Sequence, residues 1–140
     1  MKANLKDIID AIEMVSGSSQ AFMDKATGEI IWIDDYMTET MDEEEVDALY
    51  ERIENGEFYR LPDQHDIHEW EIMREFADTQ SGPVYDHLSN AIRGSGAFQR
   101  FKRALRILDL EQEWYNYRDK AFRFIAVEWC DKNGIDYDWK

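Results

Sequence analysis

The stretch AFMDKATGEIIWI (residues 21–33) decides between an all-helical chain and a mixed one. Both of its ends are apolar, and residues 29–33 are rich in the β-branched and aromatic side chains that are typical of strands. Thr27 and Gly28 lie between the two ends, where a tight turn is favoured. The pattern therefore predicts a β-hairpin at 21–33, the clearest β signal in the sequence.

On both sides of this hairpin, apolar residues recur at the spacing of amphipathic helices. We expect helices at about 5–15, 42–55, 67–77, 83–92, 98–108 and 111–133. Residues 58–61 are expected to be extended because Pro62 follows them. Gly134 is expected to end the last helix. The predicted fold is α+β and mostly helical, with one N-terminal β-hairpin packed with five or six helices.

The length of 140 residues predicts one domain over residues 1–140, because no linker rich in proline, glycine or serine divides the chain. The single cysteine, Cys130, has no partner for a disulfide, so we expect a buried structural thiol in a reducing, cytoplasmic compartment. The longest apolar runs, at 30–33 and 124–127, are four residues long. A membrane helix needs about 20 apolar residues, so we expect no membrane segment.

Charge is distributed unevenly along the chain, whose formal net charge is −15. Residues 1–92 contain 23 acidic and 6 basic side chains, whereas residues 93–140 contain 8 acidic and 10 basic side chains. The segment RGSGAFQRFKRALR (residues 93–106) has five positive charges and no negative charge. This separation predicts two chemically different surfaces.

The basic segment contains a candidate anion site. A glycine turn that leads into a helix offers backbone N–H groups to an anion, and nearby cations add attraction. The candidate residues are Gly94, Ser95, Gly96, Arg100, Lys102, Arg103 and Arg106. The default expectation is that these cations pair with the protein's own carboxylates, and the alternative is contact with phosphate or nucleic acid.

The apolar residues of the same segment predict a buried helical face. They are Phe98, Phe101, Leu105 and Leu108, spaced three or four residues apart. This spacing places them on one side of a helix. We therefore expect core residues rather than a platform on which nucleobases stack.

Several polar residues could ligate a metal or act as acids. The potential metal ligands are Asp63, His65, Asp66, His68 and Glu69, with His87 further along the chain. The zinc-protease pattern fails because Ile72 stands where its second histidine belongs, so we expect helix capping, no metal and no cofactor. Asp34, Asp35 and residues 42–45 are likewise expected to cap helices or face solvent rather than to catalyse.

A set of motifs follows a recognisable order over residues 5–135. Its members are Leu61-Pro62-Asp63, Glu69, Met73, Phe76, Gly94-Ser95-Gly96-Ala97-Phe98-Gln99-Arg100-Phe101-Lys102, Glu113-Trp114-Tyr115, Trp129 and Asn133-Gly134-Ile135. In this order they resemble a bacterial family of small acidic proteins known only as an uncharacterised protein family. The most specific element is residues 94–102. The resemblance implies a bacterial or phage source and a cytoplasmic location, and it implies no catalytic residue.

Three classes of function remain open. The preferred class is a non-enzymatic module for protein interaction or regulation, including an acidic decoy that mimics nucleic acid. The second class binds nucleic acid or phosphate through residues 93–106, and the third, an enzyme, ranks last because no nucleophile, base and oxyanion site can be named. We expect another protein as partner ahead of nucleic acid, since the net charge repels phosphates. We expect no membrane partner, and the sequence leaves the oligomeric state open.

Overall fold

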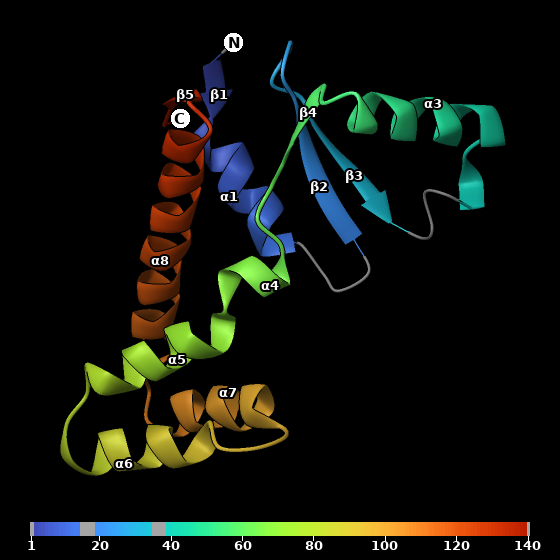
Figure 1. The fold of residues 1–140 in the computed structure, drawn as a ribbon. Helices are drawn as coiled ribbons and strands as arrows, with labels where there is room; N and C mark the ends of the chain where they lie inside the picture. Colours follow the sequence, from blue (N-terminus) through green and yellow to red (C-terminus); the bar gives the residue numbers. More distant parts are fainter. Residues whose placement is uncertain (1, 15–18, 35–38, 140) are drawn as a thin grey trace. The chain divides into compact units, whose positions relative to one another are not determined.

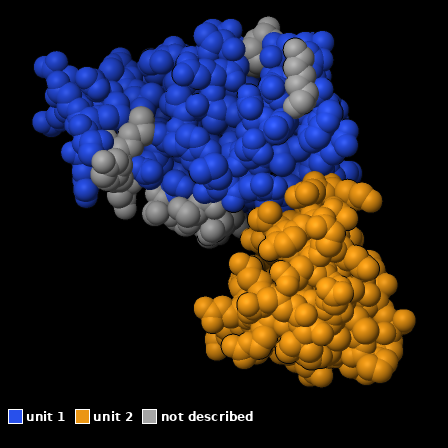
Figure 2. Space-filling model, turned by 180° about the vertical axis from the view of Figure 1, so that it is seen from behind, with its two compact units in different colours: residues 1–67, 122–140 blue, residues 68–121 orange. Residues whose placement is uncertain are grey.

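The structure, a computed structural model, describes residues 2–14, 19–34 and 39–139, except for the side chains of Gln64 and His65 (Figure 1). Its contacts divide the chain into two compact units, drawn in different colours in Figure 2. Unit 1 comprises residues 1–67 and 122–140, and unit 2 comprises residues 68–121.

The larger sheet of unit 1 is antiparallel, with the strand order β3-β2-β4. Its strands are β2 (Ser19–Asp24), β3 (Ile30–Asp34) and β4 (Phe58–Arg60). The predicted hairpin is confirmed, and its register pairs Phe22 with Ile31. The segment expected to be extended before Pro62 forms a third strand, which pairs Met23 with Tyr59. This pairing was not predicted, because a three-residue strand is too short to show alternation.

A second, parallel sheet joins the two ends of the described chain (Figure 1). It consists of β1 (Lys2–Asn4) and β5 (Asp136–Asp138), with Lys2 opposite Asp136. The helix α1 (Leu5–Met14) follows β1, and Asn4 accepts a hydrogen bond from the Lys6 N–H at 3.0 Å. This sheet was not predicted.

The core of unit 1 combines α1 with the sheet and the end of the long helix α8 (Glu111–Lys132). The apolar spacing that predicted the first helix also marks its buried face, which includes Leu5, Ile8 and Ile12. Cys130 of α8 is fully buried, as expected for a structural thiol. Burial, followed by the neighbouring Asp131, raises the pKa of this thiol to about 11. It therefore stays protonated and unreactive near neutral pH.

The predicted helix at 67–77 begins earlier and is interrupted. It consists of α4 (Gln64–Ile67) and α5 (Glu69–Asp78), separated by His68 in the left-handed conformation with φ of 51°. The predicted helix at 42–55 is α3 (Glu43–Glu54), whose N-cap Asp42 accepts a hydrogen bond from the Glu44 N–H at 3.4 Å. This capping was expected from the carboxylates that begin the segment.

Unit 2 is a helical unit around an aromatic cluster. Its elements are α5, α6 (Gly82–Ala91), α7 (Ala97–Ile107) and residues 111–121 of α8. The rings of Phe76, Phe101 and Trp114 meet edge to face, with centroids 4.9 to 6.3 Å apart. Tyr117 lies 5.4 Å from Phe76, between ring centroids. Edge-to-face contacts of this kind stabilise a core beyond the area they bury.

The mostly helical α+β class is confirmed. Gly134 follows α8 as expected. Among the described helices, none combines the length and the apolar composition that a membrane crossing requires. The expectation of one cooperative domain stays a prediction.

Candidate functional site

The turn between α6 and α7 holds the three small residues of the predicted anion site. Gly94 and Gly96 have φ of 73° and 78°, the left-handed region that favours glycine. A Cβ atom at Gly96 would lie 3.1 Å from a guanidinium nitrogen of Arg100. The glycines are therefore explained by the path of the backbone and by the close approach of Arg100.

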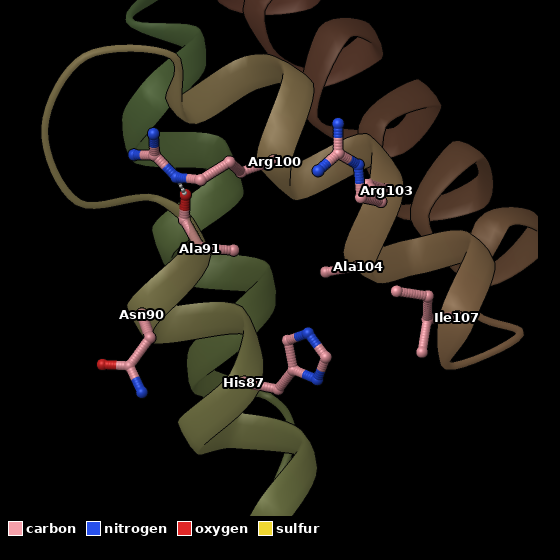
Figure 3. A pocket seen from close by; sticks show the side chains of 7 residues that line it. All are labelled: His87, Asn90, Ala91, Arg100, Arg103, Ala104 and Ile107. Carbon is pink, nitrogen blue, oxygen red and sulfur yellow. Dashed lines mark hydrogen bonds between the residues drawn. The ribbon is translucent and has the colours of Figure 1, made fainter.

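Arg100 closes this turn from the inside (Figure 3). Its Nε donates a hydrogen bond to the Ala91 carbonyl at 2.9 Å, and its two terminal nitrogens donate to the carbonyls of Arg93 and Ser95. These carbonyls lie at and just beyond the C-terminus of α6, where the helix leaves acceptors unsatisfied and where the dipole favours a cation. Arg100 thus binds the backbone of its own turn, and the anion site expected at residues 94–106 stays a prediction.

The other four cations of the segment, unlike Arg100, face solvent. Arg93, Lys102, Arg103 and Arg106 are exposed. The ion pairs of the described chain join other groups, and within this part of the chain none involves these four residues. The expected pairing with the protein's own carboxylates is therefore not seen as direct contacts between described residues.

The negative charge of the chain lies almost entirely in unit 1, whereas the basic segment lies in unit 2. Unit 1 has a formal net charge of −14 and unit 2 of −1. Residues 93–106 of unit 2 contain no carboxylate. The uneven charge along the sequence therefore corresponds to an acidic unit 1 and a nearly neutral unit 2, and unit 2 contains the basic segment 93–106.

A groove with a volume of about 400 Å³ lies between α6 and α7, and of the four exposed cations Arg103 lines it. It is lined by His87, Asn90, Ala91, Arg100, Arg103, Ala104 and Ile107. Figure 3 shows the His87 ring on α6 facing Ala104 and Ile107 on α7. Ala91 and Ala104 are buried and small, so they leave room between the two helices. The groove combines an apolar floor with a rim of His87, Asn90 and Arg103.

Two apolar side chains of α7 are exposed. Ile107 lines the groove and is 66% exposed, and Phe98 is 48% exposed. The prediction that Phe98 is a core residue is wrong. The buried stripe of α7 runs through Ala97, Phe101, Ala104 and Leu105, which leaves Phe98 at its outer edge. Phe101 and Leu105 are buried as predicted, and Leu108 is half-buried.

The groove was not predicted as such. His87 was noted only as an isolated potential ligand, and Asn90 and Ile107 were not singled out. The available signal was the i, i+3, i+4 spacing of His87, Asn90 and Ala91, repeated at Arg100, Arg103 and Ala104. Two such sets on consecutive helices indicate facing sides, but the sequence does not show that those sides meet.

The metal-ligand candidates at 63–69 are held by other interactions. Asp63 and Asp66 accept hydrogen bonds from Arg60 at 2.8 and 3.4 Å. Each of the two carboxylates also accepts from the backbone N–H of the other residue, at 3.2 and 3.1 Å. These contacts are the expected helix capping. The side chain of His65 lies outside the described residues. No group of three or more potential ligands with metal-binding geometry occurs among the residues that are described.

The remaining acidic candidates lie apart from the groove in the chain. Asp34 ends β3, and Asp35 lies outside the described residues. Asp24, a carboxylate that the sequence did not single out, ends β2; it accepts a hydrogen bond from the Ala26 N–H at 2.8 Å and pairs with Arg52 at 3.0 Å. These contacts, with the Ala26 N–H first, lower the pKa of Asp24. A carboxyl with a lowered pKa suits a structural role better than that of a general acid.

These features define a mostly helical α+β protein with a groove lined by His87, Arg100 and Arg103. The sequence profile of the uncharacterised protein family UPF0158 matches residues 1–140, and the chain belongs to this family. It is similar to the UPF0158 protein PA5073 of Pseudomonas aeruginosa, with 32% identity over 66 residues. That match covers 46% of this chain and 43% of the relative, so it spans less than half of the relative's length. No solved structure matches the chain.

Proposed function

We propose that this protein is a non-enzymatic interaction module, and that the α6–α7 groove binds an acidic amphipathic segment of a partner protein. One observation carries the proposal. Arg103 is exposed at the rim of a groove with an apolar floor, Lys102 and Arg106 are exposed elsewhere on the same helix, and no described carboxylate forms an ion pair with any of the three. A cation at the rim of an apolar groove, with two more on the same helix, matches a segment that is acidic on one face and apolar on another.

A protein segment fits this surface better than a nucleic acid. The net charge of −15 repels a polyanion, and a short acidic segment meets less of this repulsion. Single strands bind through successive stacked rings, whereas the described part of α7 exposes one ring, that of Phe98. The predicted contact between phosphate and the glycine turn loses support because Arg100 fills the inside of that turn.

The test is a fluorescence-anisotropy titration at low salt. Its probe is a labelled acidic peptide with leucines at helical spacing, compared with an oligothymidylate of similar length and with inorganic phosphate. We expect the peptide to bind with a Kd of about 10 to 100 µM. The double variant Arg103→Glu, Arg106→Glu should weaken this binding at least about tenfold, because it replaces attraction by repulsion.

The matched control is Arg74→Glu, Lys120→Glu, which changes the net charge equally at two other exposed cations of unit 2. It should alter the affinity by no more than about twofold. Equal losses in both double variants would contradict the groove as the site. Tighter binding of the oligothymidylate than of the peptide would overturn the proposal in favour of nucleic acid.

A further inference from the structure

The helix α3 of unit 1 has the chemistry that the groove of unit 2 is proposed to bind. None of its residues is buried. Val46, Leu49 and Ile53 are half-buried and Tyr50 is 45% exposed. At 100° per residue these four side chains share one stripe of the helix. An apolar stripe that a helix leaves partly exposed is available to cover another surface.

The acidic residues of α3 border this stripe. Glu43, Asp47, Glu51 and Glu54 are exposed and lie at i, i+3 and i, i+4 spacing on one side. Glu44 and Glu45 add negative charge to the first turn. The helix is therefore acidic and amphipathic, whereas the exposed face of α7 is basic and has an apolar groove beside it.

Arg52, on another side of α3, connects the helix to its own unit. Arg52 donates hydrogen bonds to Asp24 at 3.0 Å and to Glu57 at 3.2 Å, and its guanidinium lies 4.7 Å from the centre of the Phe58 ring. Arg52 is one position before Ile53 and so lies about 100° round the helix from it. These contacts of Arg52 do not use the apolar stripe, in which Val46, Leu49 and Ile53 are half-buried and the Tyr50 ring remains exposed.

We propose that α3 of one copy of the chain docks into the α6–α7 groove of a second copy. This inference rests on the proposed function, because it names an occupant for the same groove. The charge complementarity is direct, with Asp47 and Glu51 on α3 opposed to Arg103 and Arg106 on α7. The two helices are also similar in length, with 12 residues in α3 and 11 in α7.

Each copy of the chain carries both surfaces of the proposed contact, the helix α3 and the α6–α7 groove. A pair of copies therefore offers two helices and two grooves. The charge of −15 on each copy opposes their approach. Salt at physiological concentration screens that long-range repulsion beyond about 8 Å. We therefore expect a dimer with a Kd in the micromolar range.

The experiment is a charge swap measured by sedimentation velocity over a range of protein concentrations. One variant reverses the groove (Arg103→Glu, Arg106→Glu), and the other reverses the helix (Asp47→Lys, Glu51→Lys). We expect the unmodified chain to dimerise and each variant to dimerise at least about tenfold more weakly. An equimolar mixture of the two variants should dimerise again, because each then offers the charge that the other needs. Arg74→Glu, Lys120→Glu should dimerise like the unmodified chain.

Three outcomes would overturn the second-copy inference. They are a chain that is monomeric at every concentration, dimers that persist in both variants, and a mixture that stays monomeric while circular dichroism shows both variants folded. A labelled peptide of residues 42–55 separates this inference from the proposed function. If it fails to bind while the leucine-bearing acidic peptide binds, α3 is excluded and the groove remains a site. If the peptide binds only to the monomeric Asp47→Lys, Glu51→Lys variant, and the unmodified chain is also monomeric, α3 docks into the groove of its own chain.

Discussion

Phe98 and Phe101 differ sharply in exposure although they are three residues apart on α7. Phe98 is 48% exposed and Phe101 is 1% exposed. The sequence spacing alone allows both to be buried, because residues three apart share a helical face within about 60°. What decides the outcome is the position of the aromatic cluster, which Phe76 and Trp114 complete from other helices.

We expect Phe101→Ala to lower the free energy of unfolding by about 3 to 5 kcal/mol, the usual cost of emptying a buried aromatic site. Phe98→Ala is the control and should cost less than about 1 kcal/mol, because the side chain is half in solvent. Urea denaturation followed by circular dichroism measures both values. Similar losses in the two variants would contradict the assignment of Phe101 to the core and Phe98 to the surface.

Arg100 and Arg103 are three residues apart and are chemically identical, yet their predicted effects on stability differ. Arg100→Ala removes the donor that the Ala91, Arg93 and Ser95 carbonyls share, and should cost about 1 to 3 kcal/mol. Arg103→Ala should change the stability by less than about 0.5 kcal/mol, because its side chain is exposed. Thermal unfolding of the two variants measures this difference, and a larger loss for Arg103→Ala would contradict it.

At the scale of elements, local patterns predicted what depends on neighbouring residues. The hairpin follows from β-branched residues around Thr27 and Gly28, and α3 follows from a carboxylate cap and an apolar stripe. The parallel pair β1 and β5 could not be predicted, because strands of three residues have no readable period. The break at His68 was also hidden, since nothing in its neighbours requires a left-handed residue.

In the candidate site, too, local features were predictable from the sequence and contacts between elements were not. Its cations are visible in the sequence as a run of basic residues without acids. The structural role of Arg100 depends on which carbonyls lie within its reach, and the groove depends on the approach of Ala91 to Ala104 across two helices. Both facts concern distances between residues on different elements, which the order of residues does not contain.

The ion pair between Asp24 of β2 and Arg52 of α3 predicts that the stability of the fold depends on pH. The pKa of Asp24 is lowered in the folded state by the Ala26 N–H and by Arg52, so its stabilisation is present above the ordinary value of 3.8 and is lost as the pH falls through the lower folded value. Asp24→Asn should therefore lower the Tm at about pH 7, and this difference should shrink towards zero below the ordinary value.

Asp10→Asn is the control for this measurement, because Asp10 is an exposed carboxylate of α1. It should leave the Tm close to that of the unmodified chain near neutral pH. A Tm difference for Asp24→Asn that stays constant down to strongly acidic pH would show that the substitution acts through packing rather than through the charge.

At the scale of the whole molecule, we expect one cooperative unfolding transition. The helix α8 contributes residues to both units, with Trp114 buried in unit 2 and Phe122 and Cys130 buried in unit 1. Unfolding of either unit removes the packing of part of the same helix. Scanning calorimetry should give a calorimetric enthalpy equal to the van't Hoff enthalpy. Two separate heat-absorption peaks would show instead that the units unfold independently.

The pairing of β1 with β5 has a consequence for synthesis on the ribosome. Asp136 is made 134 residues after its partner Lys2. The hairpin of β2 and β3 and the rings of Phe76, Phe101 and Trp114 all precede that partner in the chain. Domains usually fold in the order in which they are translated. Here β1 must wait while all of these elements are made, and the sheet that it forms in unit 1 is completed only after β5 has left the ribosome.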